Sequence, residues 1–132
     1  MNTPTALKKE IMSGKTIAGA MVFEFFSPGM SAILSNAGSR FVIYDMEHTG
    51  LDYETLKWLF ATCRGLPITP MVRVPTREYT WIARALDIGA EGIMVPMVET
   101  RQQAEQLAES CRYPGIGRRG AAFGFEIGRA HV

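Results

Sequence analysis

The sequence predicts an α/β protein built around a parallel sheet, and two observations lead to this fold class. Short apolar segments alternate four times with segments of helical periodicity, in a repeat of roughly 20–30 residues. Polar side chains also gather where successive apolar segments end: Glu24, then Asp45, Glu47 and His48, then Arg73. Strands that alternate with helices are usually joined by right-handed crossovers into one parallel sheet, so these strand ends are expected to share an edge.

In chain order, the sequence predicts a helix, a strand and a second helix over its first 36 residues. Residues 5–13 (TALKKEIMS) predict a short amphipathic helix, and residues 16–25 (TIAGAMVFEF) predict a strand. Ser27 followed by Pro28 indicates a helix start, because proline is favoured at the first helical position. We expect this second helix to end near Asn36.

The stretch Phe41–His48 (FVIYDMEH) is the centre of the prediction. It begins as an apolar run, as buried parallel strands do, and ends in three ionisable groups. Such groups are costly to bury without partners, so the strand is expected to emerge there into a site. The alternative is a solvated loop after an ordinary strand. Alternation assigns two sets of side chains to opposite faces: Phe41, Ile43, Asp45 and Glu47 to one, and Val42, Tyr44 and Met46 to the other.

The third helix and third strand follow. Asp52 is expected to cap a helix that Gly65 ends, because glycine readily adopts the positive φ of a helix C-terminus. Residues 68–74 predict the strand. Pro70 cannot donate a hydrogen bond to a neighbouring strand, so we expect the paired part to be residues 71–74.

The last expected elements are two helices and the strand between them. Thr76 is expected to open a helix that Gly89 closes, and residues 92–98 (GIMVPMV) predict the fourth strand. Thr100 and Gln103 match a capping box at the start of the final helix, in which each side chain binds the other residue's main-chain N–H.

Two folds are compatible with this order of elements, the open doubly wound sheet and the (β/α)₈ barrel. No glycine fingerprint follows the first strand, which weakens the dinucleotide-binding form of the doubly wound sheet. Polar groups at the downstream ends of several strands favour the barrel, whose active sites are built there. A complete barrel takes about 250 residues, so this chain would supply about four of the eight units.

Composition excludes several classes of function. The 132 residues are 47% hydrophobic and 20% charged, with a net charge of +1, so no basic surface for nucleic acid is indicated. No apolar run is long enough to span a membrane, and the first residues lack the apolar centre of a signal peptide. Cys63 and Cys111 are expected to be reduced structural thiols. We therefore expect a cytoplasmic protein without nucleic-acid or membrane partners.

The last seven residues, EIGRAHV, break the preceding pattern. They resemble the translation of a common sequencing-library adapter, which suggests that the reading frame ran beyond a gene fragment. On this interpretation residues 1–125 are one domain, residues 126–132 are a non-native tail, and His131 is excluded from functional reasoning. A genuine short C-terminus is the alternative.

Four sequence blocks connect the chain with a known enzyme family. They are DMEH at 45–48, MVRVP at 71–75, ALDIGAEGIMVPMVET at 85–100 and RYPGIGRRG at 112–120. In this order and spacing they resemble the HpcH/HpaI aldolases, which are class II, metal-dependent pyruvate aldolases more distantly related to citrate lyase β-subunits. The resemblance extends through the chain to about Gly124.

The resemblance implies a cytoplasmic (β/α)₈ barrel that is often a hexamer, with its first four βα units in this chain. It also implies an aldehyde-lyase that reversibly cleaves 4-hydroxy-2-oxo acids to pyruvate and an aldehyde through a metal-stabilised enolate. The cofactor would be Mg²⁺, Mn²⁺ or Co²⁺, acting as a Lewis acid. The family's metal ligands, a glutamate and an aspartate, come from the fifth and sixth strands. No residue here is therefore assigned as a metal ligand, and the chain alone is expected to be inactive.

Five residues match functional positions of the family. His48 matches the acid/base histidine, a residue type that exchanges protons readily near neutral pH. Arg73 matches the arginine that binds pyruvate through its planar fork of donors. Asp45 and Asp87 match carboxylates that support this pair by fixing the histidine tautomer and the arginine orientation. Asp87 lies near a helix end, where action across a subunit boundary and simple solvation are both open. Glu47 is expected to accept a hydrogen bond that supports His48 and Arg73 without contacting the substrate itself.

Two departures from the family concern loops. Thr49 and Gly50 follow the histidine where the family more often has glycine directly, and Gly115 stands where a second proline is usual. These changes bear on substrate preference more than on reaction class.

Other functions stay open at this stage. A citrate-lyase-like or malyl-CoA-lyase-like enzyme would need a coenzyme A site, for which the arginines of residues 118–120 offer a phosphate contact. A catalytically inactive truncated fragment is the remaining alternative, because half a barrel leaves two sheet edges unpaired.

Overall fold

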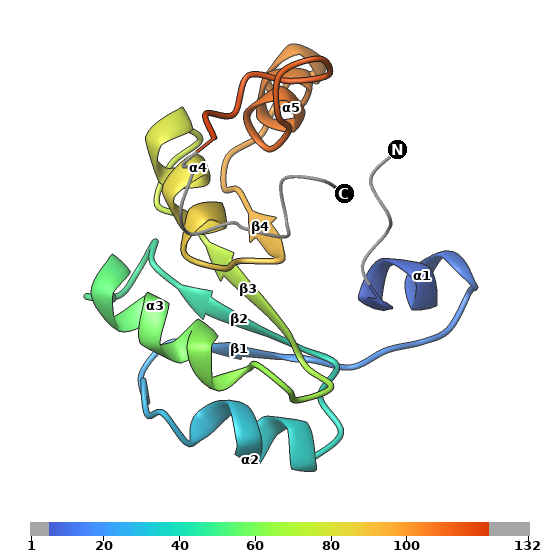
Figure 1. Cartoon of the computed structure of the whole chain (residues 1–132), viewed down its shortest axis with the longest axis vertical. Helices are drawn as coiled ribbons and strands as arrows, with labels where there is room; N and C mark the ends of the chain where they lie inside the picture. The colour runs from blue at the N-terminus through green and yellow to red at the C-terminus, as the bar shows by residue number, and fades with distance from the viewer. Residues whose placement is uncertain (1–5, 122–132) are drawn as a thin grey trace.

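The computed structural model describes residues 6–121, which contain four strands and five helices (Figure 1). The proposed tail at 126–132 and the boundary at 125 lie outside this range. In chain order the elements are α1 Ala6–Met12, β1 Ala20–Val22, α2 Met30–Asn36, β2 Phe41–Asp45, α3 Tyr53–Thr62, β3 Thr69–Arg73, α4 Tyr79–Asp87, β4 Gly92–Met94 and α5 Arg101–Ser110.

The four strands form one parallel sheet in the order β1-β2-β3-β4. The spatial order therefore repeats the chain order, with no reversal of the kind at which doubly wound sheets place their ligands. This confirms the expected α/β class and favours the barrel over the doubly wound sheet. The register places Asp45 directly opposite Arg73, and Arg73 opposite Met94, at the carboxyl edge.

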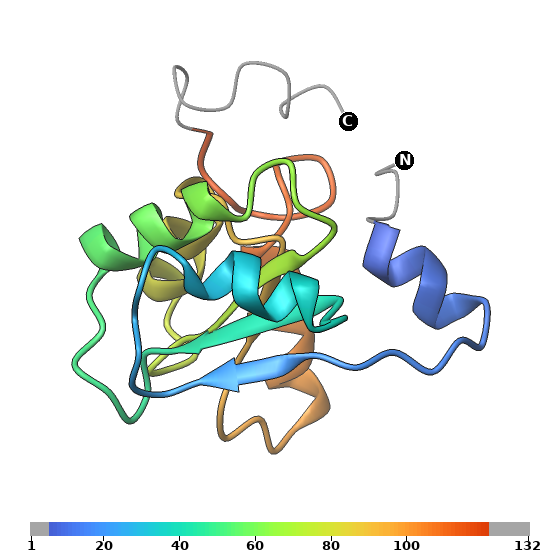
Figure 2. The same cartoon turned by 90° about the horizontal axis from the view of Figure 1, so that it is seen from below.

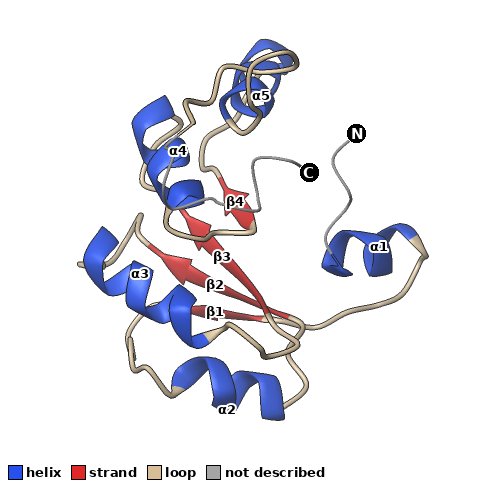
Figure 3. Ribbon diagram, in the orientation of Figure 1, coloured by secondary structure: helices blue, strands red, loops and turns tan. Residues whose placement is uncertain are grey.

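One face of the sheet is buried beneath the helices (Figure 3). Val42, Tyr44 and Met46 lie in this core, as the alternation along β2 predicts. The helices contribute apolar side chains from one face of each, among them Leu56, Leu59 and Phe60 of α3, Ile82 and Ala85 of α4, and Leu107 of α5. Buried apolar surface of this kind is the main source of stability in such a layer.

The other face of the sheet carries a second set of side chains from alternate positions. Phe41 and Met71 need space there, and Gly19, just before β1, and Gly92, at the start of β4, provide it. A Cβ atom on Gly92 would lie 2.6 Å from the terminal methyl group of Met71. This face ends in the polar pair Asp45 and Arg73.

Several helix ends match the sequence prediction. Asp52 Oδ1 accepts a hydrogen bond from Thr55 N at 2.8 Å, so Asp52 caps α3. Thr100 and Gln103 form the predicted capping box of α5. Gly65 and Gly89 have φ values of 79° and 118°, beyond the ends of α3 and α4.

The two other predicted helix starts are wrong. α2 begins at Met30 and α4 at Tyr79, later than Ser27 and Thr76 predict. In both cases the hydroxyl group accepts a hydrogen bond within a local turn, from Gly29 N and from Glu78 N respectively. Serine and threonine side chains compete in this way with helical hydrogen bonding.

Strand boundaries also differ from the prediction. β1 and β4 are three residues each, shorter than the predicted 16–25 and 92–98. β3 pairs from Thr69 rather than from residue 71, so Pro70 lies inside the paired region. Pro70 O accepts from Glu91 N on the β4 side, where β4 begins only at Gly92. Its missing N–H therefore costs the sheet no hydrogen bond.

α1 lies near the beginnings of the strands, and the strand arrows point away from it (Figure 2). Arg40, just before β2, binds Glu10 of α1 through Nε and Nη2. Cys63 and Cys111 are free, and burial raises the pKa of both thiols. Across residues 6–121, no helix is both long and apolar enough to cross a membrane.

Candidate active site

Asp45 is the most enclosed member of the polar cluster at the carboxyl edge of the sheet. Asp45 is fully buried. Oδ1 accepts hydrogen bonds from Arg73 Nε at 2.6 Å and from Glu47 N at 3.1 Å, and Oδ2 accepts from His48 N at 3.0 Å. The side chain thus holds both the arginine and the chain that turns away after β2.

Arg73 is held through one edge of its guanidinium group. Nε lies 2.6 Å from Asp45 Oδ1 and 3.2 Å from Glu47 Oε2, and the side chain is 19% exposed. The ring of Phe23 lies beneath the guanidinium, 5.6 Å from Cζ to the ring centroid. Because the two carboxylates engage Nε, the two Nη groups stay available for a planar acceptor such as a carboxylate.

His48 lies at the rim of the cluster, with its side chain 67% exposed. Its Nε2 atom is 3.7 Å from Glu47 Oε2, beyond hydrogen-bond distance. Asp45 contacts the main chain of His48, so Glu47 is the carboxylate beside the imidazole. An open imidazole next to a fixed arginine can exchange a proton with a molecule bound to that arginine.

The electrostatics of the pair follow from these contacts. Burial alone would raise the pKa of Asp45, but hydrogen bonds from Arg73 and from two main-chain N–H groups lower it below the usual value. The hydrogen bond to Asp45 raises the pKa of Arg73 further. The pair is therefore charged throughout the neutral range.

The loop after β2 is fastened by Thr49. Its hydroxyl group donates a hydrogen bond to the Asp45 carbonyl oxygen and accepts one from Leu51 N at 3.2 Å. Thr49 is one of the departures from the family, and in this chain it supports the segment that carries Glu47 and His48.

Asp87 does not lie with the other predicted site residues. It is the last residue of α4, which ends near the start of β4, at the opposite edge of the sheet. Its Oδ1 atom accepts a hydrogen bond from Arg119 Nη2 at 2.8 Å. The structure thus brings together four predicted residues and places Asp87 elsewhere.

A divalent metal ion bound within the part of the chain that the structure describes would require a cluster of ligating side chains. Within residues 6–121, no three His, Cys, Asp or Glu side chains are grouped so that they would hold one. The Asp45 carboxylate accepts hydrogen bonds from Arg73 and from two main-chain N–H groups, and Glu47 Oε2 lies 3.2 Å from Arg73 Nε, so both carboxylates face a cation that the protein itself supplies.

Phe23 is a site residue that the sequence interpretation missed. Alternation along the first strand places Phe23 on the same face as Met21, and this is the only signal in the sequence. The register, which pairs Met21 with Ile43, then places Phe23 on the face of Asp45. Glu24, at the same strand end, is exposed.

A parallel sheet in sequential order, with charged side chains at its carboxyl edge, is the arrangement found in part of a (β/α)₈ barrel. Within that class the chain belongs to the HpcH/HpaI aldolase/citrate lyase family, whose profile matches residues 20–129.

Individual relatives support the assignment. A hydroxypyruvate/pyruvate aldolase of Roseobacter denitrificans is 39% identical over 124 residues, covering 93% of this chain and 47% of that protein. A 5-keto-4-deoxy-D-glucarate aldolase of Escherichia coli is 38% identical over 96 residues, covering 73% of this chain and 38% of that protein. The crystal structure of an HpcH/HpaI aldolase from Desulfitobacterium hafniense superposes with a TM-score of 0.85 at 29% identity, covering 90% of this chain and 46% of that one. The chain thus spans about half the length of these relatives or less, and its fold is part of the barrel.

Proposed function

We propose that the protein containing this chain is an aldolase that reversibly cleaves 4-hydroxy-2-oxo acids to pyruvate and an aldehyde. The observation that carries the proposal is the arginine held through Nε, with its Nη groups free of the two carboxylates and an exposed histidine beside it. Membership of an aldolase family supports the reaction class. Small-molecule 2-oxo acids and aldehydes would be the partners, in a cytoplasmic homo-oligomer that the family suggests is a hexamer.

In the cleavage direction, Arg73 would bind the carboxylate of the 2-oxo acid through its Nη groups. His48 would accept the proton of the C4 hydroxyl group, directly or through a water molecule. As the C4 carbonyl forms, the C3–C4 bond breaks and its electron pair passes into the enolate of pyruvate. Asp45 and Glu47 would keep the guanidinium in place, which lowers the entropic cost of binding.

The resemblance implies Mg²⁺, Mn²⁺ or Co²⁺ in the complete enzyme. When bound, it would stabilise the enolate oxygen as a Lewis acid, and its ligands are expected outside the described residues. We propose for the same reason that the 132-residue chain alone has no metal-dependent turnover.

The coenzyme A alternative rested on the arginines of residues 118–120. Arg118 donates to Ser110 Oγ and lies over the Tyr79 ring, and Arg119 binds Asp87. Both arginines hold the segment against α4 and α5, so no observation favours their binding phosphate.

The proposal is tested by His48→Ala in the complete enzyme. We expect retro-aldol turnover to fall by about 10²–10⁴, the usual contribution of a positioned acid/base. Retro-aldol rates are measured with pyruvate detection, and the isolated chain is the negative control. Turnover within about threefold of the parent enzyme would remove His48 from the role, since an acid/base residue contributes far more.

A further inference from the structure

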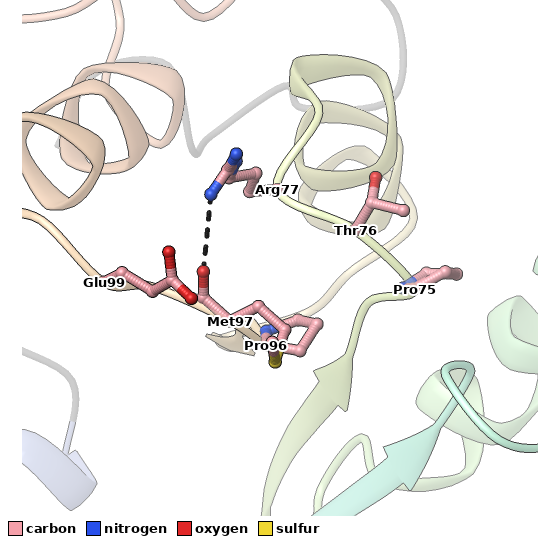
Figure 4. Close-up of a pocket in the computed structure, with 6 residues that line it drawn as sticks. All are labelled: Pro75, Thr76, Arg77, Pro96, Met97 and Glu99. Atoms are coloured by element: carbon pink, nitrogen blue, oxygen red, sulfur yellow. Dashed lines mark hydrogen bonds between the residues drawn. The ribbon is translucent and has the colours of Figure 1, made fainter.

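The loops at the carboxyl edge of the sheet differ in how they are held. The loops that follow β3 and β4 border a cavity of about 350 Å³ (Figure 4). Arg77 Nη1 of the first loop donates a hydrogen bond of 3.4 Å to the Met97 carbonyl oxygen of the second, which is long for such a bond. The loop after β2, residues 46–51, is instead closed by a series of hydrogen bonds within itself, and this loop carries His48.

Both ends of the loop after β2 are anchored in the core. Met46 and Leu51 are 6% and 7% exposed and lie among the buried apolar side chains. Between them, the Asp45 carboxylate binds the main-chain N–H groups of Glu47 and His48. This carboxylate holds the chain only up to the amide group that precedes the His48 side chain. The segment after the histidine therefore needs a second attachment.

Thr49 supplies the second attachment. Its hydroxyl group donates to the Asp45 carbonyl oxygen and accepts from Leu51 N, so one oxygen serves the loop as both donor and acceptor. Asp45 thus holds the chain on both sides of His48, before it through the carboxylate and after it through the carbonyl group. Gly50 adds no such constraint, because its φ lies outside the left-handed region and a Cβ atom there would meet nothing within 4 Å.

The imidazole of His48 depends on this backbone for its position. The side chain is 67% exposed, and across residues 6–121 no hydrogen bond holds its ring. Arg73 is held differently, because its Nε atom binds Asp45 Oδ1 directly at 2.6 Å. Loss of the Thr49 hydroxyl group is therefore expected to move the imidazole and to leave the guanidinium group in place.

We propose that Thr49 is a positioning residue for the acid/base histidine. Its hydroxyl group fixes the peptide group that follows His48, and so sets where the imidazole lies relative to the Nη edge of Arg73. This role rests on the proposed function and adds to it a residue that acts on proton transfer without touching the substrate. Displacement of a reacting group by about 1 Å can lower a rate by about 10²-fold. The effect belongs to kcat, because Arg73 still binds the substrate carboxylate.

The test compares Thr49→Val with Thr49→Ser in the complete enzyme. Valine keeps the branched shape and removes the hydroxyl group, whereas serine keeps the hydroxyl group. We expect Thr49→Val to lower kcat for retro-aldol cleavage by about 10–10²-fold with KM within about twofold, and Thr49→Ser to stay within about threefold of the parent enzyme. Gly50→Ala is the matched control in the same loop and should behave as the parent enzyme, because its added Cβ has open space.

The His48→Ala background separates positioning from general support of the fold. No imidazole is left to position there, so adding Thr49→Val should lower kcat by no more than about twofold further. Hydrogen exchange in the 132-residue chain gives a readout that needs no turnover. The Leu51 N–H should exchange about tenfold faster in Thr49→Val than in Thr49→Ser, because only serine still accepts its hydrogen bond.

Three results count against the proposals in different ways. Equal kcat in the parent enzyme, Thr49→Val and Gly50→Ala, with His48→Ala strongly impaired, would overturn the role of Thr49 and leave the proposed function intact. A Thr49→Val loss that appears in KM, or that persists in full without His48, would also overturn it, because Thr49 would then support Arg73 or the fold. Turnover by His48→Ala within about threefold of the parent enzyme would remove the proposed function, and the role of Thr49 with it.

Discussion

Two arginine–aspartate pairs in this molecule have nearly the same length and different surroundings. Arg73 and Asp45 approach to 2.6 Å, and Arg119 and Asp87 to 2.8 Å. Asp45 is fully enclosed and also accepts two main-chain N–H groups, whereas the Asp87 side chain is 30% exposed. In the first pair the aspartate is enclosed and the arginine offers its Nη edge outward. In the second the arginine is enclosed, over the Tyr113 ring, and the aspartate is open.

The difference indicates that a short ion pair does not by itself mark a site. Asp45 holds Arg73 through Nε and leaves its Nη edge outward, where we propose that the substrate carboxylate binds. Arg119 instead fastens the segment after α5 to α4, together with Gly120 N, which donates to the Tyr79 hydroxyl at 2.7 Å. In that segment Gly115 has a φ of 107°, which proline cannot adopt, so the segment could not follow this path with a proline at position 115.

The largest expected contrast is in catalysis by the complete enzyme. Arg73→Lys should lower kcat/KM for retro-aldol cleavage by about 10²–10³, because an ammonium group cannot reproduce the two Nη donors. Arg119→Lys keeps a cation beside Asp87, outside the reacting groups. It should therefore change kcat/KM by less than about threefold. Steady-state kinetics on both variants decide the comparison. Equal losses would mean that the two pairs share one function.

The second contrast is in the stability of the 132-residue chain. Asp45→Asn leaves Arg73 without its buried partner, and we expect the free energy of unfolding to fall by about 3 kcal/mol. Asp87→Asn should cost about 1 kcal/mol, because water reaches this carboxylate and Arg119 keeps its contact with the Tyr113 ring. Urea unfolding followed by the fluorescence of Trp58 and Trp81 measures both. A larger loss for Asp87→Asn would reverse the assignment of the structural pair.

The third contrast concerns assembly. Asp87 lines a groove of about 590 Å³ between α3 and α4, beside the exposed Trp58. If a second subunit brings its His48 to this groove, Asp87→Asn should lower turnover of the complete enzyme about tenfold, less than loss of the acid/base itself. It should leave pyruvate binding by the isolated chain unchanged.

Mixed oligomers separate this role from a structural one. When His48→Ala and Asp87→Asn subunits are mixed and reassembled, some sites receive an intact residue from each, so activity should exceed that of either variant alone. Activity no higher than that of the parent variants would confine Asp87 to its contact with Arg119.

Sequence reasoning predicts the first pair and not the second, for a physical reason. Asp45 and Arg73 end adjacent parallel strands, and strand order with register brings such residues together. Asp87 and Arg119 meet because a loop folds back along α4, and no periodicity reports that path. The helix starts at Ser27 and Thr76 failed similarly, since a hydroxyl group serves a turn or a cap equally well and surrounding contacts decide between them.

The smallest expected effect is the pH dependence of the free energy of unfolding. The sign of this dependence follows from the pair of Asp45 and Arg73, whose pKa values are shifted in the folded state. The folded state lowers the pKa of Asp45 below its unfolded value of about 3.9. The carboxylate therefore contributes its full stabilisation above that value and loses it as pH falls through the folded pKa. Arg73 stays charged throughout, so it does not alter this sign.

The unfolding free energies of the parent chain and Asp45→Asn should thus differ by a constant amount from pH 7 to about 5, and the gap should narrow below about 4, where the unfolded aspartate becomes protonated. Urea titrations at each pH measure the gap, with Asp87→Asn run in parallel to account for the general effect of acid on the fold. If this difference in unfolding free energy stays constant down to the lowest pH, Asp45 stabilises the fold through packing and not through its charge. The arginine would then be held by packing against Phe23, and the two pairs would differ in burial alone.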